Sequence, residues 1–165
     1  MRKSGVLLAL MTTTVLTGCY HYPVPVPCPA IAQATAVSVT VAREYAAQVG
    51  TLNLKACQGG VCRESGVELF PGSDSIDQGC TPDGVCSATA SPNGTRIGHL
   101  MLDTLTEEPM ELTATGTTPD GSALPVRTLE FRPRGAYPFG EHCGRFITAS
   151  VILDANGLRQ SDAGG

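Results

Sequence analysis

Cysteine is the residue type in this sequence with the widest choice of chemistry. The chain has seven cysteines in 165 residues, and one of them, Cys143, directly follows His142. A thiol beside an imidazole suggests a nucleophile and its general base. We expect this pair on a strand, however, where adjacent side chains point to opposite faces and are poorly placed to exchange a proton. The sequence therefore predicts no catalytic residue at this position.

The sequence lacks the usual spacings of metal and cofactor sites. Its three histidines, His21, His99 and His142, are scattered, and His-x-His, His-x-x-x-His and Cys-x-x-Cys are all missing. The acidic segment from Asp74 to Gly79 has isoleucine at the third position of a calcium loop, so we interpret it as a solvated loop. Gly-x-Ser-x-Gly and Gly-x-Gly-x-x-Gly are also missing. We therefore predict no metal, no cofactor and no enzymatic activity.

The first nineteen residues are organised as an export signal. Arg2 and Lys3 precede an apolar stretch that is too short to cross a membrane as a helix. The stretch ends in Leu16-Thr17-Gly18-Cys19, which resembles the lipobox of bacterial lipoproteins. The resemblance implies that residues 1–18 are a signal peptide and that Cys19 carries the acyl chains, since two or three chains anchor a protein stably. An ordinary secretory signal and a helical anchor are the alternatives.

A proline-rich segment follows, with proline at every second position from Pro23 to Pro29. Proline disfavours both helices and sheet ladders, so we expect polyproline II. Residues 19–30 are therefore predicted to be a lipid anchor and a tether of roughly 30 Å. We expect a single domain over residues 31–160 and a disordered tail over residues 161–165.

The other six cysteines predict three disulfides, because the compartment outside the cytoplasmic membrane is oxidising. Two pairs would each flank a short turn, Gly59-Gly60 in one case and Pro82-Asp83-Gly84 in the other. The third pair follows by default and would tie the start of the domain to its last strand. Spacing alone leaves other connectivities open. The favoured pairs are Cys57–Cys62, Cys80–Cys86 and Cys28–Cys143.

Alternation of apolar and polar residues predicts strands that bury one face. The alternation is clearest over residues 37–41, 51–56, 110–115 and 147–153. A turn template of Pro, then Asp or Asn, then Gly occurs three times, at residues 81–84, 91–94 and 118–121, and Asp154 to Gly157 is a looser relative. These turns predict antiparallel hairpins.

Two other segments have distinct compositions. Residues 43–49 could form a short helical turn that ends at Gly50. The stretch from Pro71 to Gly94 is rich in Gly, Ser, Asp and Pro, so we expect it to be mostly loop.

Seven or eight short strands joined by such turns predict an all-β fold. The expected architecture is a disulfide-stabilised antiparallel β-sandwich of immunoglobulin-like shape. A small closed barrel is the alternative. Because the Cys-Trp-Cys signature of immunoglobulin domains is absent, the resemblance is one of architecture only.

Arginine and aromatic residues gather late in the chain. They could form an interaction patch, since both types are enriched at interfaces, or a charged strand edge that blocks aggregation. The net charge of −4 argues against nucleic acid and against an anionic membrane surface as the main partner. The residues of this predicted patch are Arg127, Arg132, Arg134, Tyr137 and Arg145.

Together these features predict a lipoprotein of the cell envelope that acts as a non-enzymatic binding or structural module. An accessory subunit of an envelope complex is the first alternative, and an unrecognised hydrolase is the second. The expected partners are the membrane, through the lipid, and an envelope protein or polymer. Tyr20 follows the lipobox cysteine in place of the aspartate typical of inner-membrane retention. By resemblance to Gram-negative lipoproteins this favours the outer membrane, and in an organism with one membrane we expect the outer face of the cytoplasmic membrane.

Overall fold

The computed structural model describes residues 27–30 and 33–161. The predicted signal peptide, Cys19, the first part of the predicted tether and residues 162–165 of the predicted tail lie outside the described residues. Ser161, the first residue of that tail, donates a backbone hydrogen bond of 2.9 Å to the carbonyl of Ser150. The hydrogen-bonded structure therefore extends to Ser161.

Ten strands and two short helical segments make up the described part of the chain. The strands are β1 (Ala36–Val41), β2 (Thr51–Gln58), β3 (Val61–Val67), β4 (Phe70–Cys80), β5 (Cys86–Met101), β6 (Met110–Thr117), β7 (Arg127–Phe131), β8 (Arg134–Ala136), β9 (Phe146–Asp154) and β10 (Gly157–Gln160). The helical segments are α1 (Arg43–Ala46) and the 3-10 segment η1 (Glu141–Cys143). No helix among the described residues has the length and apolar character needed to span a membrane.

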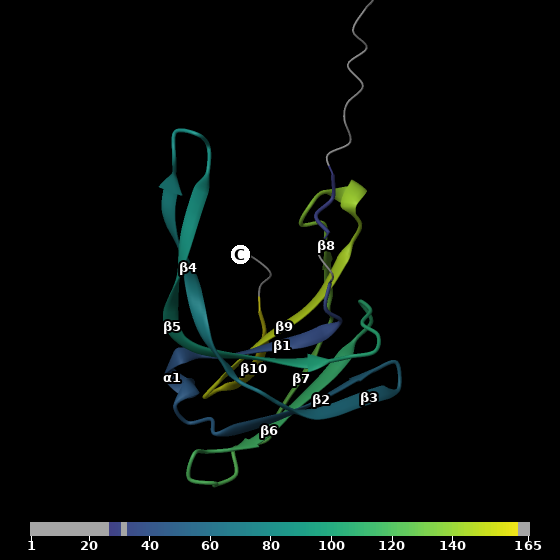
Figure 1. Ribbon diagram of the computed structural model, residues 1–165. Coiled ribbons are helices and arrows are strands. Elements are labelled where there is room, and N and C mark those ends of the chain that lie inside the picture. The colour runs from purple at the N-terminus through teal and green to yellow at the C-terminus, as the bar shows by residue number, and fades with distance from the viewer. Residues whose placement is uncertain (1–26, 31–32, 162–165) are drawn as a thin grey trace, which may run out of the picture.

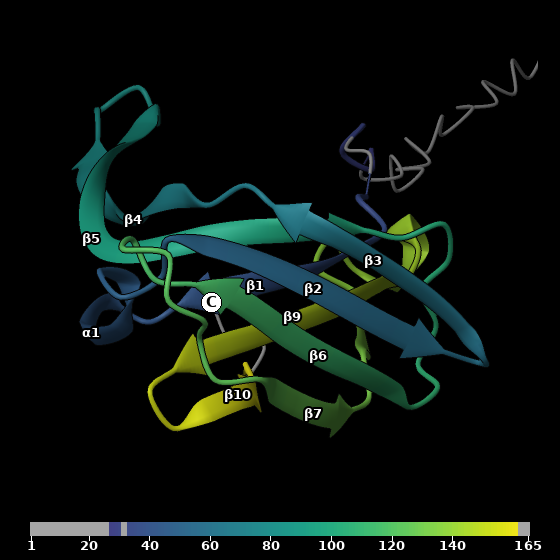
Figure 2. The same cartoon turned by 90° about the horizontal axis from the view of Figure 1, so that it is seen from below.

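Two sheets pack face to face, which confirms the predicted β-sandwich (Figures 1 and 2). The larger sheet has the order β10-β9-β1-β5-β4, and β8 also pairs with β9. The smaller sheet has the order β3-β2-β6-β7. Paired strands are antiparallel except for β1 and β9, which are parallel. The short strands β8 and β10, together with β4, raise the number of strands above the predicted seven or eight.

The sandwich core contains the apolar side chains that the alternation predicted to face inward. In the larger sheet, Val37, Val39 and Val41 of β1 are fully buried. In the smaller sheet, Leu54 of β2 and Leu112 of β6 are fully buried as well. Burial of each such side chain stabilises the fold by about 1.5–3 kcal/mol. This burial determines which face of each strand turns inward.

The helical turn expected over residues 43–49 is present in a shorter form as α1. Tyr45 and Ala46 are buried and join the core cluster, together with Val49 just beyond the helix. The segment α1 therefore closes one end of the sandwich (Figure 1).

Two of the three predicted template turns are hairpin turns. Gly84 and Gly121 have φ values of 81° and 90°, in the left-handed region that favours glycine. Each donates a backbone hydrogen bond to the first residue of its turn, at 2.9 Å to Thr81 and 3.0 Å to Thr118. The looser relative also forms a turn, because Asp154 pairs with Gly157 where β9 meets β10.

The loop predicted from Pro71 to Gly94 is wrong, because β4 and β5 form a long ribbon that projects from the sandwich (Figure 1). We call residues 73–92 the arm. All described side chains of the arm within these two strands are exposed, on both faces of the ribbon. Because neither face of the ribbon packs against a core, its side chains need not alternate between apolar and polar. The arm therefore has the composition of a loop and the backbone pairing of a hairpin.

The template turn predicted at residues 91–94 is also wrong, since these residues lie within β5. Gly94 keeps a left-handed φ of 78°, but the chain does not reverse there. Pro71 pairs with Arg96 and Ser73 with Pro92, so residues 93–95 oppose the single residue Gly72. Such a bulge bends and twists a ribbon. The bulge lies where the ribbon turns away from the sandwich (Figures 1 and 2).

Candidate interaction site

The tip of the arm is closed by a disulfide and a tight turn. Cys80 and Cys86 are bonded, with their Cα atoms 3.9 Å apart. Within the turn, the backbone N–H of Thr81 donates to the carbonyl of Val85 at 2.8 Å. Just before the disulfide, the backbone N–H of Gly79 donates to a carboxylate oxygen of Asp77 at 2.7 Å. Local bonds therefore fix the shape of the tip without contact with the core.

The base of the arm is organised around Asn93. Its side-chain oxygen accepts hydrogen bonds from the backbone N–H and the hydroxyl of Thr95, at 3.0 and 2.7 Å. Its amide nitrogen donates to Asp74 across the ribbon at 2.8 Å. Arg43 of α1 donates through Nε to the Asn93 carbonyl. A Cβ atom on Gly94 would lie 2.9 Å from Cγ of Arg43, so glycine permits this close approach.

The surface of the arm combines apolar, acidic and backbone groups. Val85 is 66% exposed and Ile76 is 47% exposed. The arm contains three acidic residues, Asp74, Asp77 and Asp83, and no lysine or arginine. In the part of the chain that the structure describes, β4 is the last strand of its sheet, so its outer edge has no neighbouring strand. An unpaired edge and exposed apolar side chains are features of surfaces that bind other chains.

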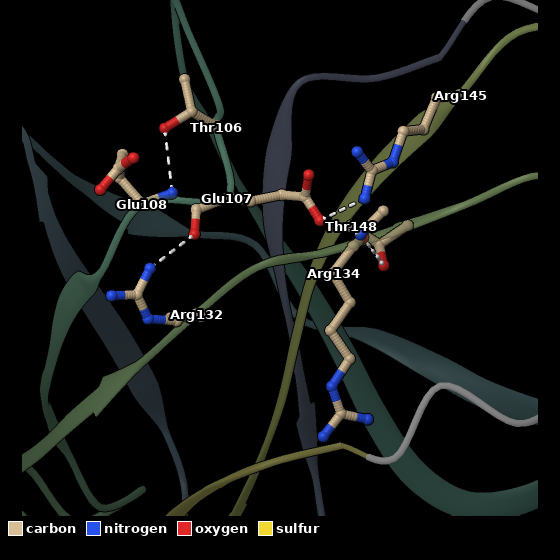
Figure 3. A network of polar contacts seen from close by, with 8 residues as sticks. Thr106, Glu107, Glu108, Arg132, Arg134, Arg145 and Thr148 are labelled. Atoms are coloured by element: carbon tan, nitrogen blue, oxygen red, sulfur yellow. Dashed lines mark hydrogen bonds and ion pairs between the residues drawn. The ribbon is translucent and has the colours of Figure 1, made fainter.

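The predicted arginine patch is divided in the structure. Arg127 begins β7 and donates through Nη2 to the carbonyl of Ala155 at 2.8 Å, while Arg132 lies just beyond the other end of β7. Arg145 lies with its Cζ atom 6.0 Å from the ring centroid of Tyr137. Arg132 and Arg145 both bond to Glu107, whereas the guanidinium of Arg134 extends away from it (Figure 3). The predicted patch is therefore divided, with Arg127 apart from Glu107 and the Arg134 side chain turned in another direction.

Glu107 is a residue whose role the sequence analysis missed. Its carboxylate accepts hydrogen bonds from Arg145 Nη2 at 2.7 Å and from the backbone N–H of Gly135 at 3.0 Å (Figure 3). Its backbone carbonyl accepts a bond from Arg132 at 3.4 Å. These contacts hold the loop before β6 to Gly135 of β8, to Arg132 between β7 and β8, and to Arg145 just before β9. They favour the interpretation of the arginines as a charged strand edge, so we assign the candidate interaction site to the arm.

A second missed feature is a serine–histidine pair on the outer face of the larger sheet. Ser38 of β1 and His99 of β5 lie directly opposite each other, with Oγ and Nδ1 3.0 Å apart. Ser150 of β9 occupies the position on the other side of Ser38. A nucleophilic serine also needs a group that orients its base. Among residues 27–30 and 33–161, no carboxylate hydrogen-bonds to His99.

The local structure expected for His142 and Cys143 is wrong, since both lie in η1 and not in a strand. Gly140 and Gly144 flank η1 with φ values of 86° and 90°, which interrupt the extended backbone. Cys143 is bonded to Cys28, with their Cα atoms 5.3 Å apart. All three favoured disulfides are therefore present: Cys28–Cys143, Cys57–Cys62 and Cys80–Cys86.

Comparison with known proteins assigns no family to this fold. No protein-family model matches the chain, and no curated protein and no solved structure matches it either.

Proposed function

We propose that this protein is a lipid-anchored lipoprotein of the cell envelope. On this proposal, its β-sandwich is a non-enzymatic module that binds its partner through the arm. The arm is the observation on which the binding function rests. It exposes Ile76, Val85 and an unpaired strand edge far from the core, and the exposed apolar groups contribute nothing to the core. Burial of these exposed groups against a partner would remove their apolar surface from water and so favour the complex.

The proposed location is supported by the lipobox-like tetrad ending at Cys19 and by the cysteines that follow it. All six cysteines after Cys19 are paired in disulfides. Disulfides of this kind are typical of proteins outside the cytoplasm. The tetrad and the disulfides are independent features of the chain, and both favour an envelope protein.

The direction of the arm supports a partner on the membrane side of the domain. The arm and the first described segment, residues 27–30, rise from the same side of the larger sheet (Figure 1). The disulfide between Cys28 and Cys143 fixes the point where the tether leaves the domain. If the tether leads to the membrane, the arm points toward the same surface, where a membrane-bound envelope protein would meet it.

Site-specific photo-crosslinking tests the binding proposal. A photoreactive residue replaces Val85 in the full chain, and cells are irradiated before their membranes are isolated. Val61 is a matched control, because it is 72% exposed and lies beside a disulfide at the tip of the β2–β3 hairpin. We expect a discrete adduct from position 85 and none from position 61. Equal labelling from both positions, or none from position 85, would contradict the proposal.

The nature of the adduct separates the two binding alternatives. A stoichiometric protein adduct would favour an accessory subunit of an envelope complex, and an adduct with an envelope polymer would favour a separate binding module. Lipidation is tested independently by feeding cells an alkyne-labelled fatty acid. We expect the label on the wild-type chain and not on a Cys19→Ala variant. An unlabelled wild-type chain would contradict the anchor and leave the arm proposal standing.

A further inference from the structure

The disulfide that holds the start of the domain has a histidine beside it. One ligand atom from each of Cys28, His142 and Cys143 lies within 4.8 Å of the other two. Cys28 Sγ is 3.8 Å from the backbone oxygen of His142. Among the described residues, neither of the other two disulfides belongs to such a group. Two sulfurs and an imidazole form a donor set that suits thiophilic cations.

We propose that Cys28, His142 and Cys143 form a redox-gated metal site for a thiophilic d10 cation such as Zn²⁺. While the disulfide is intact, the sulfurs are not thiolates and the site is closed. The proposal departs from the sequence-based prediction of no metal, which took these cysteines as permanently bonded. Reduction converts the same three residues into a two-sulfur, one-nitrogen site with a coordination position left for water.

The reaction balances with a dithiol as reductant. The dithiol transfers two electrons and two protons to the disulfide, which becomes two Cys thiols, and is itself oxidised to a disulfide. Binding of Zn²⁺ by the two sulfurs then releases two protons, while neutral His142 donates its nitrogen lone pair. The proposal therefore requires an envelope dithiol that can reach the bond. Cys28 is exposed and Cys143 is partly exposed, so such access exists.

The sandwich keeps the ligands near one another after reduction. Strand β9 begins at Phe146, three residues after Cys143, and it pairs in parallel with β1 from Val37 and Ala149 onward. Gln33, closer to Cys28 in the chain, donates through Nε2 to the carbonyl of Ile147 at 2.6 Å. These contacts do not involve sulfur. The two thiols therefore stay at high effective concentration when their bond is broken.

The ligands need only a small rearrangement to coordinate an ion. In a tetrahedral zinc site the sulfur atoms are roughly 3.7 Å apart, as follows from a Zn–S distance of about 2.3 Å. Opening the disulfide moves the sulfurs toward this separation. Glycines with left-handed φ stand on both sides of η1, and a Cβ atom on Gly140 would lie 3.0 Å from the His142 ring. Glycine at position 140 thus leaves space for the ring.

Cobalt is the probe for the test, because Co²⁺ bound to thiolate gives a charge-transfer absorption band and replaces zinc in such sites. The full chain is purified in detergent, reduced with a phosphine and titrated with Co²⁺. We expect a one-to-one complex with a thiolate band that Zn²⁺ abolishes. The oxidised protein should give no band. Far-UV circular dichroism confirms that the reduced chain keeps its sheets.

Variants assign the ligands. The band should disappear in Cys28→Ser/Cys143→Ser and persist in Cys57→Ser/Cys62→Ser. His142→Ala should weaken Co²⁺ binding by roughly tenfold or more, while the matched variant His99→Ala should leave it unchanged. Equal affinity in His142→Ala and wild type, an undiminished band in Cys28→Ser/Cys143→Ser, or no band in the reduced protein would overturn the proposal. A chain that unfolds on reduction would overturn it too, because the site needs the sandwich to hold both thiols.

Discussion

The sandwich and the arm are built from the same backbone pairing but are stabilised in different ways. Each central strand of the sandwich buries one face, as Val37, Val39 and Val41 of β1 do. The arm buries neither face and is held by strand pairing, by one disulfide and by polar contacts at its base. Alternating polarity therefore predicts strands that bury one face, as in the sandwich. It does not predict strands that bury neither face, as in the arm.

This difference has a consequence for local stability. A two-stranded ribbon is marginally stable by itself in water. Segments with few buried apolar contacts open at low free energy, whereas core strands open only with global unfolding. We therefore expect the arm to open and close while the sandwich stays folded.

Removing a core side chain should affect stability far more than removing one from the arm. We expect Leu112→Ala to lower the free energy of unfolding by about 3–5 kcal/mol, because it leaves a cavity among fully buried neighbours. Ile76→Ala is the matched change in the arm, and it should alter that free energy by less than about 0.5 kcal/mol. Urea denaturation followed by circular dichroism measures both. A comparable loss from Ile76→Ala would show that the arm packs on the core.

Removing a disulfide from the sandwich should likewise affect global stability far more than removing the disulfide of the arm. The bond between Cys28 and Cys143 spans 115 residues, so its removal should lower the free energy of unfolding by about 4–5 kcal/mol in the chain-entropy model. Removing the bond between Cys80 and Cys86 should leave global unfolding nearly unchanged and speed amide exchange in the arm. Hydrogen exchange resolved by segment measures both effects. Faster exchange throughout the sandwich in the Cys80→Ser/Cys86→Ser variant would contradict the separation.

A smaller effect is expected at the Glu107 network. Glu107→Gln weakens the ion pair with Arg145. The side chains of Glu107 and Arg145 are 38% and 47% exposed, so solvent screening limits the loss in free energy of unfolding to about 0.5–1 kcal/mol. The loss should shrink as salt concentration rises. Glu64→Gln on exposed β3 is the control. Thermal unfolding at low and high salt measures the difference, and identical behaviour of the two variants would rule out a contribution from the network.

The smallest effect should be the pH dependence of the turn at residues 118–121. The Thr118 hydroxyl and then the backbone N–H of Ser122 donate to the Asp120 carboxylate and hold its pKa below the ordinary value. Because the pKa is lower in the folded chain, the ionised carboxylate stabilises the fold at every pH above its ordinary pKa. This contribution is lost as the pH falls below about 4 and through the lowered pKa. The Asp120 carboxyl resonance should titrate at lower pH in the folded than in the urea-unfolded chain. Equal midpoints would contradict the assigned contacts.

The sequence predicted the parts of the molecule in which local pattern and burial agree. Alternation located β1, β2, β6 and β9, and glycine turns between cysteines located the two hairpin disulfides. The sequence could not reveal the Glu107 network, because Arg145 is 38 residues away in the chain and a single acidic residue has no sequence pattern that predicts its partner. The pairing of Ser38 with His99 depends on strand order, which spacing does not reveal.

The arm shows why the same residues can be interpreted in two ways. Pro92-Asn93-Gly94 suits a turn because glycine accepts a left-handed φ, and a bulge needs the same conformation. Whether the chain reverses there depends on the partner strand. The polar, glycine-rich composition of residues 71–94 agrees with the exposure of the arm, but it predicted a loop where the backbone forms a paired ribbon.

Excising the arm tests whether the sandwich provides the stability of this protein and the arm provides its binding. Residues 73–92 are replaced by an Asn-Gly turn in the full chain, and the partner identified by crosslinking from position 85 is quantified by co-purification from native membranes. We expect the free energy of unfolding to stay within about 0.5 kcal/mol of wild type and the partner to be lost. An unfolded sandwich, or a partner retained at wild-type levels, would contradict the claim.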